Sequence, residues 1–431
     1  MSDICSRGKW DDDWQLSYNY RKTPGKRFAD GQGFRLKTKE MIKFIDDKLK
    51  VLKDAGFYRC LSLIQSPQGP KVKINGTDAI LLCSNNYLGL ANHPKIKQAA
   101  IKAVEKYGFG SGASRLVSGN MELHSELEQR LARFKGTEAA LVFNSGYHAN
   151  IGIISALVGR GDVIFSDKLN HASIIDGGIL SRAKFIRYPH KGINALESLL
   201  KKHSSLNTRH STLIVTDGIF SMDGDIAPLK ELFELADKYN CILMVDDAHA
   251  TGVLGANGKG ALEHFNIDSS NIIQMGTLGK AFGCFGAYVA GSKKLVDYLI
   301  NKARSFIYTT SLPPSVCAAG IAALDIMENE PQLRRDLWDR VVYFRTELKQ
   351  AGFDTLKSET QIIPILVGEA EKAVRISRDL LGKGIFLQAI RPPTVPEGTS
   401  RLRVTLMANH SWDDLKYAIE TIKDVAKDAC K

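Results

Sequence analysis

The stretch EAALVFNSGYHANIGIISALVGRGDVIFS, residues 138–166, decides the fold. It opens with a strand-like apolar run at 138–143, continues as a helical pattern after Gly146, and closes on a second strand-like run at Val163–Ser166. A strand, a helix and a second strand in this order are the repeating unit of a parallel sheet. The alternation continues toward the carboxyl end, with strand-like runs at Lys184–Tyr188, Thr212–Thr216, Ile242–Asp246, Ile272–Met275 and Ala287–Ala290. The sequence therefore predicts the α/β class, with a mostly parallel wound sheet covered by helices on both faces.

Changes of pattern divide the chain into four segments: an N-terminal extension at 1–40, a helix and hairpin segment at 41–90, a large domain at 91–320 and a small C-terminal α/β domain at 321–431. The extension is polar and basic and predicts no core of its own. Asn75-Gly76, between β-branched residues, is a strong hairpin signal. In the last segment, strands are predicted at Ile362–Val367, Phe386–Ile390 and Arg401–Leu406.

The composition excludes several classes of protein. Apolar residues make up 44% and charged residues 24% of the 431 positions, as in globular proteins. No apolar run approaches the roughly eighteen residues of a membrane span, and Asp11–Asp13 argue against a signal peptide. The seven cysteines are scattered, without the pairing of a metal site or a disulfide framework. We therefore expect a reducing cytoplasm, no membrane association and no metal.

The formal net charge of +11 bears on partners. A nucleic-acid-binding protein gathers its basic residues on one stripe with aromatic residues between them, whereas here they are dispersed and mixed with acids. No nucleic-acid partner is expected. A polyanionic small substrate or an acidic carrier protein is compatible with the charge through electrostatic steering, and solubility alone explains it equally well.

Residues at the ends of two strand-like runs carry chemistry, and ligands of wound sheets gather at such ends. Ser145-Gly146 turns one run into a helix, so its backbone N–H groups can bind an anion such as phosphate. Asp246 and His249 follow another run. A buried carboxylate is costly unless it meets a cation, and a protonated pyridinium nitrogen is such a cation. A metal site and a helix-capping aspartate are the alternatives for this motif.

Two further residues stand at comparable junctions. Lys280 follows a strand-like run and lies among glycines and apolar residues, where desolvation would lower its pKa and allow it to form a Schiff base. A lone lysine is more often a solvated surface charge. His171 lies at a strand-to-helix junction, where a capping or surface histidine is the more common case.

Taken in order, these residues resemble the fold-type-I pyridoxal-phosphate (PLP) enzymes. The motifs CSNNYLGL at 83–90, GSGASR at 110–115, FSMDGD at 220–225 and TLGK at 277–280 are similar to those of the α-oxoamine synthases, and the resemblance runs from about residue 46 to the carboxyl end. Two departures are Ala250, where the family commonly has glycine, and the extension. The resemblance implies a fold-type-I PLP-transferase whose large domain binds the cofactor.

The resemblance also implies roles for particular residues. The catalytic residues would be Lys280, which would hold PLP as a Schiff base and move the α-proton, with His171 on the ring and Asp246 at the pyridine nitrogen. The remaining cofactor-binding residues would be Ser221 and His249 at the phenolic oxygen, and Gly146, Tyr147, Thr277 and, from a second subunit, Thr310 at the phosphate. The substrate residues would be Asn85, Arg403 and Arg59, the last near the acyl chain. The implied assembly is a homodimer with shared active sites.

The spacing of residues in the strand predicted at Arg401–Leu406 independently supports the substrate-binding role of Arg403. Strand alternation puts Arg401, Arg403 and Thr405 on one face, where a guanidinium can bind a carboxylate with two parallel hydrogen bonds. A surface salt bridge is the alternative, with Arg401 as the second candidate for the carboxylate.

Within the family, AIRPPTVP at 389–396 and GTSRLRVTL at 398–406 most resemble the members that condense L-alanine with a pimeloyl thioester, carried by coenzyme A or acyl carrier protein, in biotin synthesis. The expected activity is therefore a decarboxylative condensation of this pair. Glycine C-acetyltransferase, serine palmitoyltransferase and 5-aminolevulinate synthase are alternatives with the same machinery. An aminotransferase is a more distant alternative, and a catalytically inactive scaffold is an alternative of another class.

Overall fold

The structure is a computed structural model that describes residues 38–54, 56–204, 210–268 and 270–426. The predicted extension at 1–40 lies outside these residues, except for 38–40. The chain divides into two compact units, Met1–Arg59 and Cys60–Lys431. In the first unit, helix α2 (Thr38–Asp54) is the helix predicted from the spacing of its apolar residues, and Gly56 follows it with a φ of 68°, the left-handed conformation of a C-cap.

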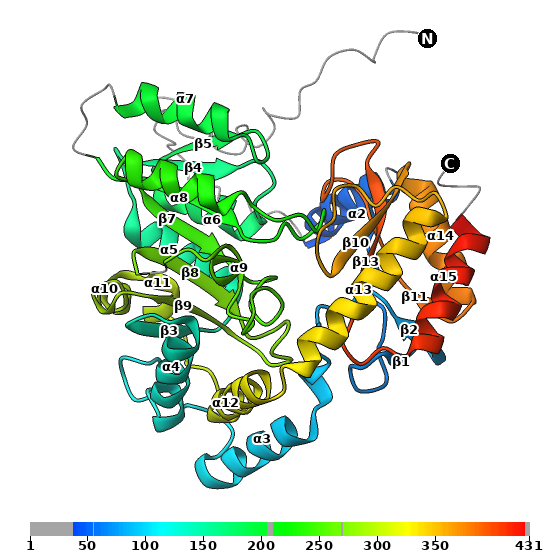
Figure 1. Ribbon diagram of the computed structural model, residues 1–431, viewed down its shortest axis with the longest axis horizontal. Coiled ribbons are helices and arrows are strands. Elements are labelled where there is room, and N and C mark those ends of the chain that lie inside the picture. Colours follow the sequence, from blue (N-terminus) through cyan, green and yellow to red (C-terminus); the bar gives the residue numbers. More distant parts are fainter. Residues whose placement is uncertain (1–37, 55, 205–209, 269, 427–431) are drawn as a thin grey trace. The chain divides into compact units, whose positions relative to one another are not determined.

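The second unit is built on a seven-stranded sheet in the order β3-β9-β8-β7-β6-β4-β5 (Figure 1). The strands β5, β4, β6, β7 and β8 pair in parallel, whereas β9 runs antiparallel to both β8 and β3. The bounds are β3 (Ala139–Phe143), β4 (Val163–Asp167), β5 (Lys184–Tyr188), β6 (Thr212–Asp217), β7 (Ile242–Asp246), β8 (Ile272–Thr277) and β9 (Ala287–Gly291). The predicted mostly parallel wound sheet is confirmed.

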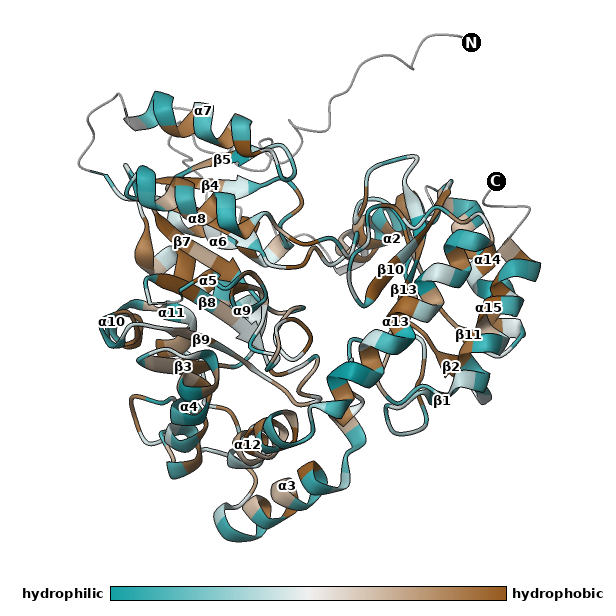
Figure 2. Cartoon of the chain, viewed as in Figure 1, coloured by the Kyte–Doolittle hydropathy of each residue, from teal (hydrophilic) through white to brown (hydrophobic). Residues whose placement is uncertain are grey.

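Both faces of this sheet are covered, because successive side chains of a strand point to opposite sides and both sets are apolar (Figure 2). The face that carries Leu141, Ile164 and Met244 packs against α5 (Gly146–Leu157), α6 (Ala172–Ser181), α10 (Lys293–Lys302) and α11 (Arg304–Ile307). The other face packs against α4 (Glu122–Lys135), α7 (Ile193–Ser204), α8 (Leu229–Lys238), α9 (Ala261–Phe265) and α12 (Pro314–Asn329). Helix α3 (Pro94–Tyr107), preceded by the short η1 (Leu90–Asn92), lies along α12.

Two three-stranded sheets and the helices that accompany them complete this unit. The antiparallel sheet β10-β13-β12 consists of β10 (Ile362–Gly368), β13 (Ser400–Thr405) and β12 (Gln388–Ile390). The hairpin expected at Asn75-Gly76 is present as β1 (Lys71–Ile74) and β2 (Thr77–Leu81), and β2 pairs in parallel with β11 (Ile385–Phe386). The accompanying helices are α13 (Gln332–Gln350), α14 (Ala370–Gly382) and α15 (Trp412–Ala426). The sheet β1-β2-β11 therefore contains strands from segments far apart in the sequence. The predicted domain boundaries at residues 90 and 320 stay predictions.

One predicted element is wrong. The run Phe386–Ile390 was expected to be a single strand, but it is split at Leu387 into β11 and β12, which belong to different sheets. Phe386 pairs with Leu81 and Gln388 pairs with Arg403. Leu387 between them is fully buried, and its carbonyl accepts a hydrogen bond from Ser377 Oγ at 2.6 Å. A continuous apolar pattern does not reveal that its two halves have different partners.

Among the described residues, no helix is both long and apolar enough to cross a membrane.

Candidate active site

The carboxyl ends of the central strands bring the predicted residues together. Asp217 at the end of β6 is the register partner of Asp246 at the end of β7, and Asp246 is the partner of Met275 in β8. Lys280 follows β8, and its charge acts on both Asp217 and His171. Residues separated by more than a hundred positions in the sequence thus share one edge of the sheet.

Asp246 is a buried carboxylate held in a fixed orientation. Its Oδ2 accepts a hydrogen bond from Asn150 Nδ2 at 2.7 Å, and its Oδ1 accepts one from the backbone N–H of Ala248 at 3.0 Å. Asn150 in α5 also donates to Ser173 Oγ at 2.8 Å, which ties α5 to α6. Both donors are neutral and do not cancel the carboxylate charge, so Asp246 can pair with a cation in the site.

Lys280 has the environment of a reactive amine. Burial lowers its pKa to about 8; Asp246 and Asp217 counteract the shift, and the positive charge of Arg403 adds to it. No hydrogen bond or ion pair within the described ranges involves its Nζ. The turn is held in place by Gly283, whose φ is +64° and whose Cβ, if present, would lie 2.3 Å from the backbone nitrogen of Ala91. Only glycine lets this turn pack so closely.

His171 is the N-cap residue of α6. Its Nδ1 lies 2.7 Å from Ser173 Oγ and accepts from the backbone N–H of Ser173 at 3.3 Å, and its own backbone N–H donates to Asp217 Oδ2 at 3.1 Å. Desolvation lowers the pKa of the ring, Asp246 raises it and Lys280 lowers it further. The ring is therefore neutral near pH 7. Ser173 fixes its orientation through Nδ1, and the residue remains exposed to solvent. Its capping role, the common alternative, and a cofactor contact are compatible with each other.

The turn after β3 has the form of an anion site. Ser145 caps α5 by accepting from the backbone N–H of His148 at 3.2 Å. Gly146 and Tyr147, the first two residues of the helix, have no intrahelical acceptor for their N–H groups. Thr277 Oγ1 donates to the carbonyl of Gly286 at 2.9 Å, and the carbonyl of Thr310 accepts from Asn144 Nδ2 at 2.8 Å. Two free amides at the positive end of a helix suit a phosphate.

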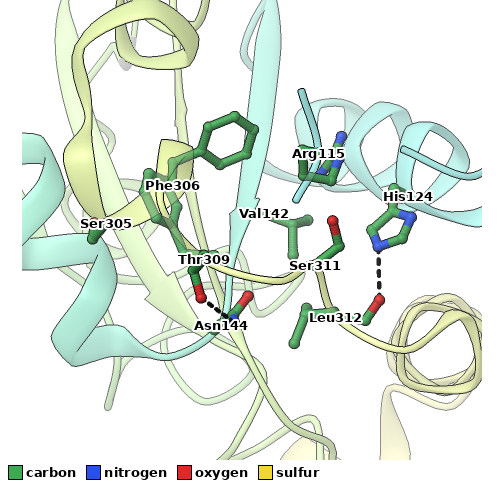
Figure 3. Close-up of a pocket in the computed structure, with 10 residues that line it drawn as sticks. Arg115, His124, Val142, Asn144, Ser305, Phe306, Thr309, Ser311 and Leu312 are labelled. Carbon is green, nitrogen blue, oxygen red and sulfur yellow. Dashed lines mark hydrogen bonds between the residues drawn. The ribbon is translucent and has the colours of Figure 1, made fainter. Parts of the chain in front are cut away.

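A small cavity is lined by residues that include Asn144, which directly precedes this turn (Figure 3). Its volume is about 10 Å³, enough for about one water molecule. Ser311 lines it, and the buried hydroxyl of this residue has no hydrogen-bond partner. Beside it, Asn144 Nδ2 donates to Thr309 Oγ1 at 3.1 Å, and His124 Nε2 lies 2.9 Å from the carbonyl of Leu312. The contacts fix the segment that carries Thr310.

A chain of hydrogen bonds connects the cofactor side of the site with the substrate side. His249 Nδ1 lies 2.6 Å from the hydroxyl of Tyr87, which donates to Asn85 Oδ1 at 3.1 Å. Asn85 Oδ1 also accepts from both terminal nitrogens of Arg403, at 3.4 and 3.3 Å. Burial holds the pKa of His249 well below its usual value, and the charges of Lys280 and Arg403 contribute to this. His249 is therefore a neutral ring.

Arg403 and Arg401 lie on the same face of β13, as predicted, but differ in their partners. Arg401 Nη1 pairs with Asp223 Oδ1 at 2.6 Å. Arg403 is only 7% exposed, and its partners are neutral: Nε donates to the carbonyl of Ser221 at 2.6 Å, and Asn85 takes the remaining contacts. Within the described part of the chain, no ion pair involves Arg403. A buried guanidinium without a counter-ion can accept a carboxylate as its partner.

Asp217, Asn150 and Tyr87 are site residues that the sequence analysis missed. Burial, and next the charge of Asp246, raise the pKa of Asp217 well above its usual value, and its buried Oδ1 has no partner. A signal for Asp217 existed, because an acidic residue follows the predicted strand at 212–216. The predicted substrate residue Arg59 belongs to the other compact unit, and its role stays a prediction.

The arrangement fits PLP. The orphan amides after Ser145 suit its phosphate, the uncompensated carboxylate of Asp246 suits a pyridinium, and the unpartnered amine of Lys280 suits an aldehyde. Ser221 is partly exposed, and its carbonyl accepts from Arg403, whose charge also acts on the neutral ring of His249. A metal fits less well, since no group of three or more ligating side chains occurs among the residues that the structure describes.

Comparison with known proteins agrees with this geometry. Residues 77–422 match the family described as aminotransferase class I and II. The chain is 59% identical over 390 residues to the 8-amino-7-oxononanoate synthase of Geobacter sulfurreducens, covering 90% of this chain and 99% of that protein.

Solved structures give the same result. A serine palmitoyltransferase from S. paucimobilis with a bound PLP–myriocin adduct superimposes with a TM-score of 0.85 at 31% identity, covering 91% of this chain and 99% of the other. The 8-amino-7-oxononanoate synthase of Francisella tularensis gives a TM-score of 0.70 at 33% identity, covering 81% and 98%.

Proposed function

The chain belongs to the aminotransferase class I and II family and within it to the α-oxoamine synthases, and from this membership we propose that it joins L-alanine to a pimeloyl thioester with PLP as cofactor. The products are 8-amino-7-oxononanoate, carbon dioxide and the free thiol, so the carbon and sulfur atoms balance without an oxidant or reductant. The single observation that carries the proposal is Arg403, a buried guanidinium without a counter-ion at the edge of a site that also holds Lys280 and Asp246. This is the charge that an amino-acid carboxylate requires.

PLP, when bound, withdraws electrons from the α-carbon of the amino acid and so acidifies the α-proton. Asp246 would keep a proton on the pyridine nitrogen, because Asn150 and Ala248 hold its carboxylate in place without neutralising it. His171 would lie against the ring, and Ser221 and His249 would hold the phenolic oxygen. The amides of Gly146 and Tyr147, with Thr277, would hold the phosphate.

Arg403 and Asn85 hold the carboxylate of alanine and thereby orient its α-carbon. Lys280 removes the α-proton, and its lowered pKa of about 8 keeps a substantial share of the amine neutral near pH 7.5 for this task. The carboxylate leaves as carbon dioxide after the new carbon–carbon bond forms. Lys280 then returns a proton to the α-carbon.

Fewer observations support the binding of the acyl half of the substrate than the binding of alanine. Arg59 is the residue we assign to the acyl chain or its carrier. The net charge of +11 favours coenzyme A phosphates or an acidic carrier protein, so the apparent affinity for the thioester decreases as salt is added.

A substrate panel tests the proposed function. Alanine, glycine and serine are each combined with pimeloyl, acetyl, succinyl and palmitoyl thioesters, and thiol release is measured. We expect the highest kcat/KM for alanine with the pimeloyl thioester, and no release above background by Lys280→Ala. A preference for glycine with acetyl-coenzyme A, or for serine with the palmitoyl thioester, identifies a different member of the family and refutes the proposal.

We also propose a homodimer, from an apolar surface next to the phosphate turn. Phe109, Val117, Phe285 and Tyr308 are 76%, 79%, 56% and 70% exposed. Their loops lie together, since Ser111 Oγ donates to the carbonyl of Ser311 at 2.9 Å. Large exposed apolar residues in one region mark an interface. A second copy packed here would bring its Thr310 toward the phosphate. Light scattering is expected to give twice the chain mass, and Tyr308→Asp is expected to yield monomers with weaker PLP binding.

A cytoplasmic location completes the proposal. Burial raises the pKa of Cys83, Cys284 and Cys317 to about 12, so these thiols stay protonated. The five described cysteines are all free, which suits a reducing compartment.

A further inference from the structure

His190 forms a bridge between two buried carboxylates that the proposed mechanism does not use. It follows β5, and its Nδ1 lies 3.0 Å from Asp167 Oδ1 at the end of β4. Its Nε2 lies 2.9 Å from Asp225 Oδ2. The side chains of Asp167 and Asp225 are 2% and 5% exposed. The edge of the imidazole also contacts the ring of Phe220, with ring centroids 4.4 Å apart.

This bridge requires the imidazolium form, since each carboxylate accepts from one ring nitrogen and both nitrogens must donate. Burial lowers the pKa of His190, but the hydrogen bonds that its ring donates to Asp167 and Asp225, together with the charges of these carboxylates, outweigh burial and raise the pKa to about 9. The other charge near the bridge is Lys191, whose Nζ lies 3.2 Å from Asp225 Oδ2 and 3.6 Å from Glu359.

Asp225 closes the loop that carries Ser221. The backbone N–H of Phe220 donates to the carbonyl of Asp225 at 3.0 Å, and the N–H of Gly224 donates to the carbonyl of Phe220 at 2.8 Å. The carbonyl of Ser221 in this loop accepts the 2.6 Å hydrogen bond from Arg403 Nε. Movement of Asp225 therefore moves the strongest contact that orients Arg403.

The loop has little freedom on its opposite side. Gly224 has a φ of +72°, and a Cβ on it would lie 2.0 Å from the carbonyl oxygen of Ile362. The carbonyl of Gly224 accepts from Thr360 Oγ1 at 2.8 Å and from the N–H of Glu359 at 3.0 Å. The loop is thus held between β10 on one side and His190 on the other, and Arg403 takes its position from it.

We propose that His190 is a positioning residue for amino-acid binding: it holds Asp225, and through the Ser221 loop it sets the guanidinium of Arg403 for the substrate carboxylate. The inference rests on the proposed function, because it takes Arg403 as the carboxylate receptor. It assigns to a residue outside the site a selective effect on one of the two substrates.

Two variants of similar size separate positioning from simple structural support. In His190→Asn the amide nitrogen replaces Nδ1, so the contact with Asp167 is retained and the contact with Asp225 is lost. In His190→Gln the amide nitrogen replaces Nε2, so the reverse holds. The loss of one charge-assisted hydrogen bond is expected to raise the KM for alanine roughly tenfold in His190→Asn. His190→Gln is expected to restore most of this loss, to within about threefold of wild type.

The readout is specific to one substrate. At saturating alanine, kcat and the KM for the pimeloyl thioester are expected to change by less than about threefold in both variants, because the acyl half does not contact Arg403. General destabilisation would affect both variants and both substrates alike. Equal KM values for alanine in the two variants, or a change confined to the thioester, overturn the inference.

The wild-type enzyme provides a test without substitution. Propionate, which is alanine without its amino group, is used as a competitive inhibitor between pH 7 and 10. Its inhibition constant is expected to rise roughly three- to tenfold as pH increases through about 9, because one carboxylate then loses its donor on His190. His190→Gln, which has no ionisable ring, is expected to lack this rise, while any effect of Lys280 remains in both proteins. A constant value for the wild type rejects the inference.

Failure of the proposed function would look different. If the wild type releases no thiol from alanine and the pimeloyl thioester, the function is wrong. If it does so while the two His190 variants are indistinguishable, only the positioning role is wrong.

Discussion

Replacement of Arg403 by methionine gives the most direct test of the site. Methionine fills much of the same volume but removes the charge and all donors. Arg403 is 7% exposed and the hydrogen bonds of its guanidinium go to Ser221 and Asn85, so the group is largely desolvated before any substrate arrives. Loss of a desolvated charge pair with the alanine carboxylate costs about 2–4 kcal/mol. At about 1.4 kcal/mol per tenfold change, the dissociation constant for alanine rises roughly 30- to 1000-fold.

Arg401→Met is the matched control, because the two arginines lie on the same strand face two residues apart. Arg401 is also buried, but its charge is already paired with Asp223. Its replacement is expected to lower stability and to leave alanine affinity within about threefold.

The assay is a spectrophotometric titration of each PLP-loaded variant with alanine, with urea unfolding to check stability. A second readout is the pKa of Lys280 in the apoenzyme. Arg403 contributes to its depression, so Arg403→Met raises it from about 8 toward the ordinary value. Unchanged alanine binding by Arg403→Met, together with weak binding by Arg401→Met, would refute the assignment and transfer the carboxylate to Arg401.

Three other predictions follow from the charges in the structure. The rate at which the apoenzyme takes up PLP covalently is expected to increase with pH with a midpoint near 8, because only the neutral amine of Lys280 reacts; absorbance measures this, and a midpoint near 10 contradicts it. Asp246→Asn is expected to retain PLP but to slow α-proton exchange of alanine, followed by NMR in D2O, by at least about 100-fold; near-normal exchange removes Asp246 from this role. Lys135→Met leaves Asp247, 1% exposed, without its 2.9 Å partner and is expected to reduce the free energy of unfolding in urea by about 3–5 kcal/mol, part of which Lys135→Met/Asp247→Asn recovers.

The residues that the sequence located correctly are those whose neighbours in the chain already define the environment. Lys280 follows an apolar run and precedes the tightly packed Gly283, so its desolvation could be anticipated from the adjacent sequence. The pairing of Arg401 and Arg403 on one face followed from strand alternation. The mostly parallel sheet followed from the repeated strand and helix unit.

The properties that the sequence did not reveal depend on partners distant in the chain. Spacing could not choose between Arg401 and Arg403, because the choice is made by Asp223, which lies on a loop more than 170 positions earlier in the sequence. Tyr87 joins the site through the contact of its hydroxyl with His249, which lies more than a hundred residues away. The break at Leu387 also depends on distant partners, because the residues before it pair with β2 and the residues after it pair with β13.

The contact between Asn85 and Arg403 has a consequence for the nascent chain. Asn85 lies just after β2, whereas its partner Arg403 follows 318 positions later in the sequence. Lys280, Asp246 and the phosphate turn all emerge earlier, and a domain generally folds once its sequence is out. During synthesis the polypeptide therefore becomes able to capture its cofactor before it is able to recognise an amino acid. Premature termination in the last segment would leave a product that is coloured by PLP and does not bind alanine.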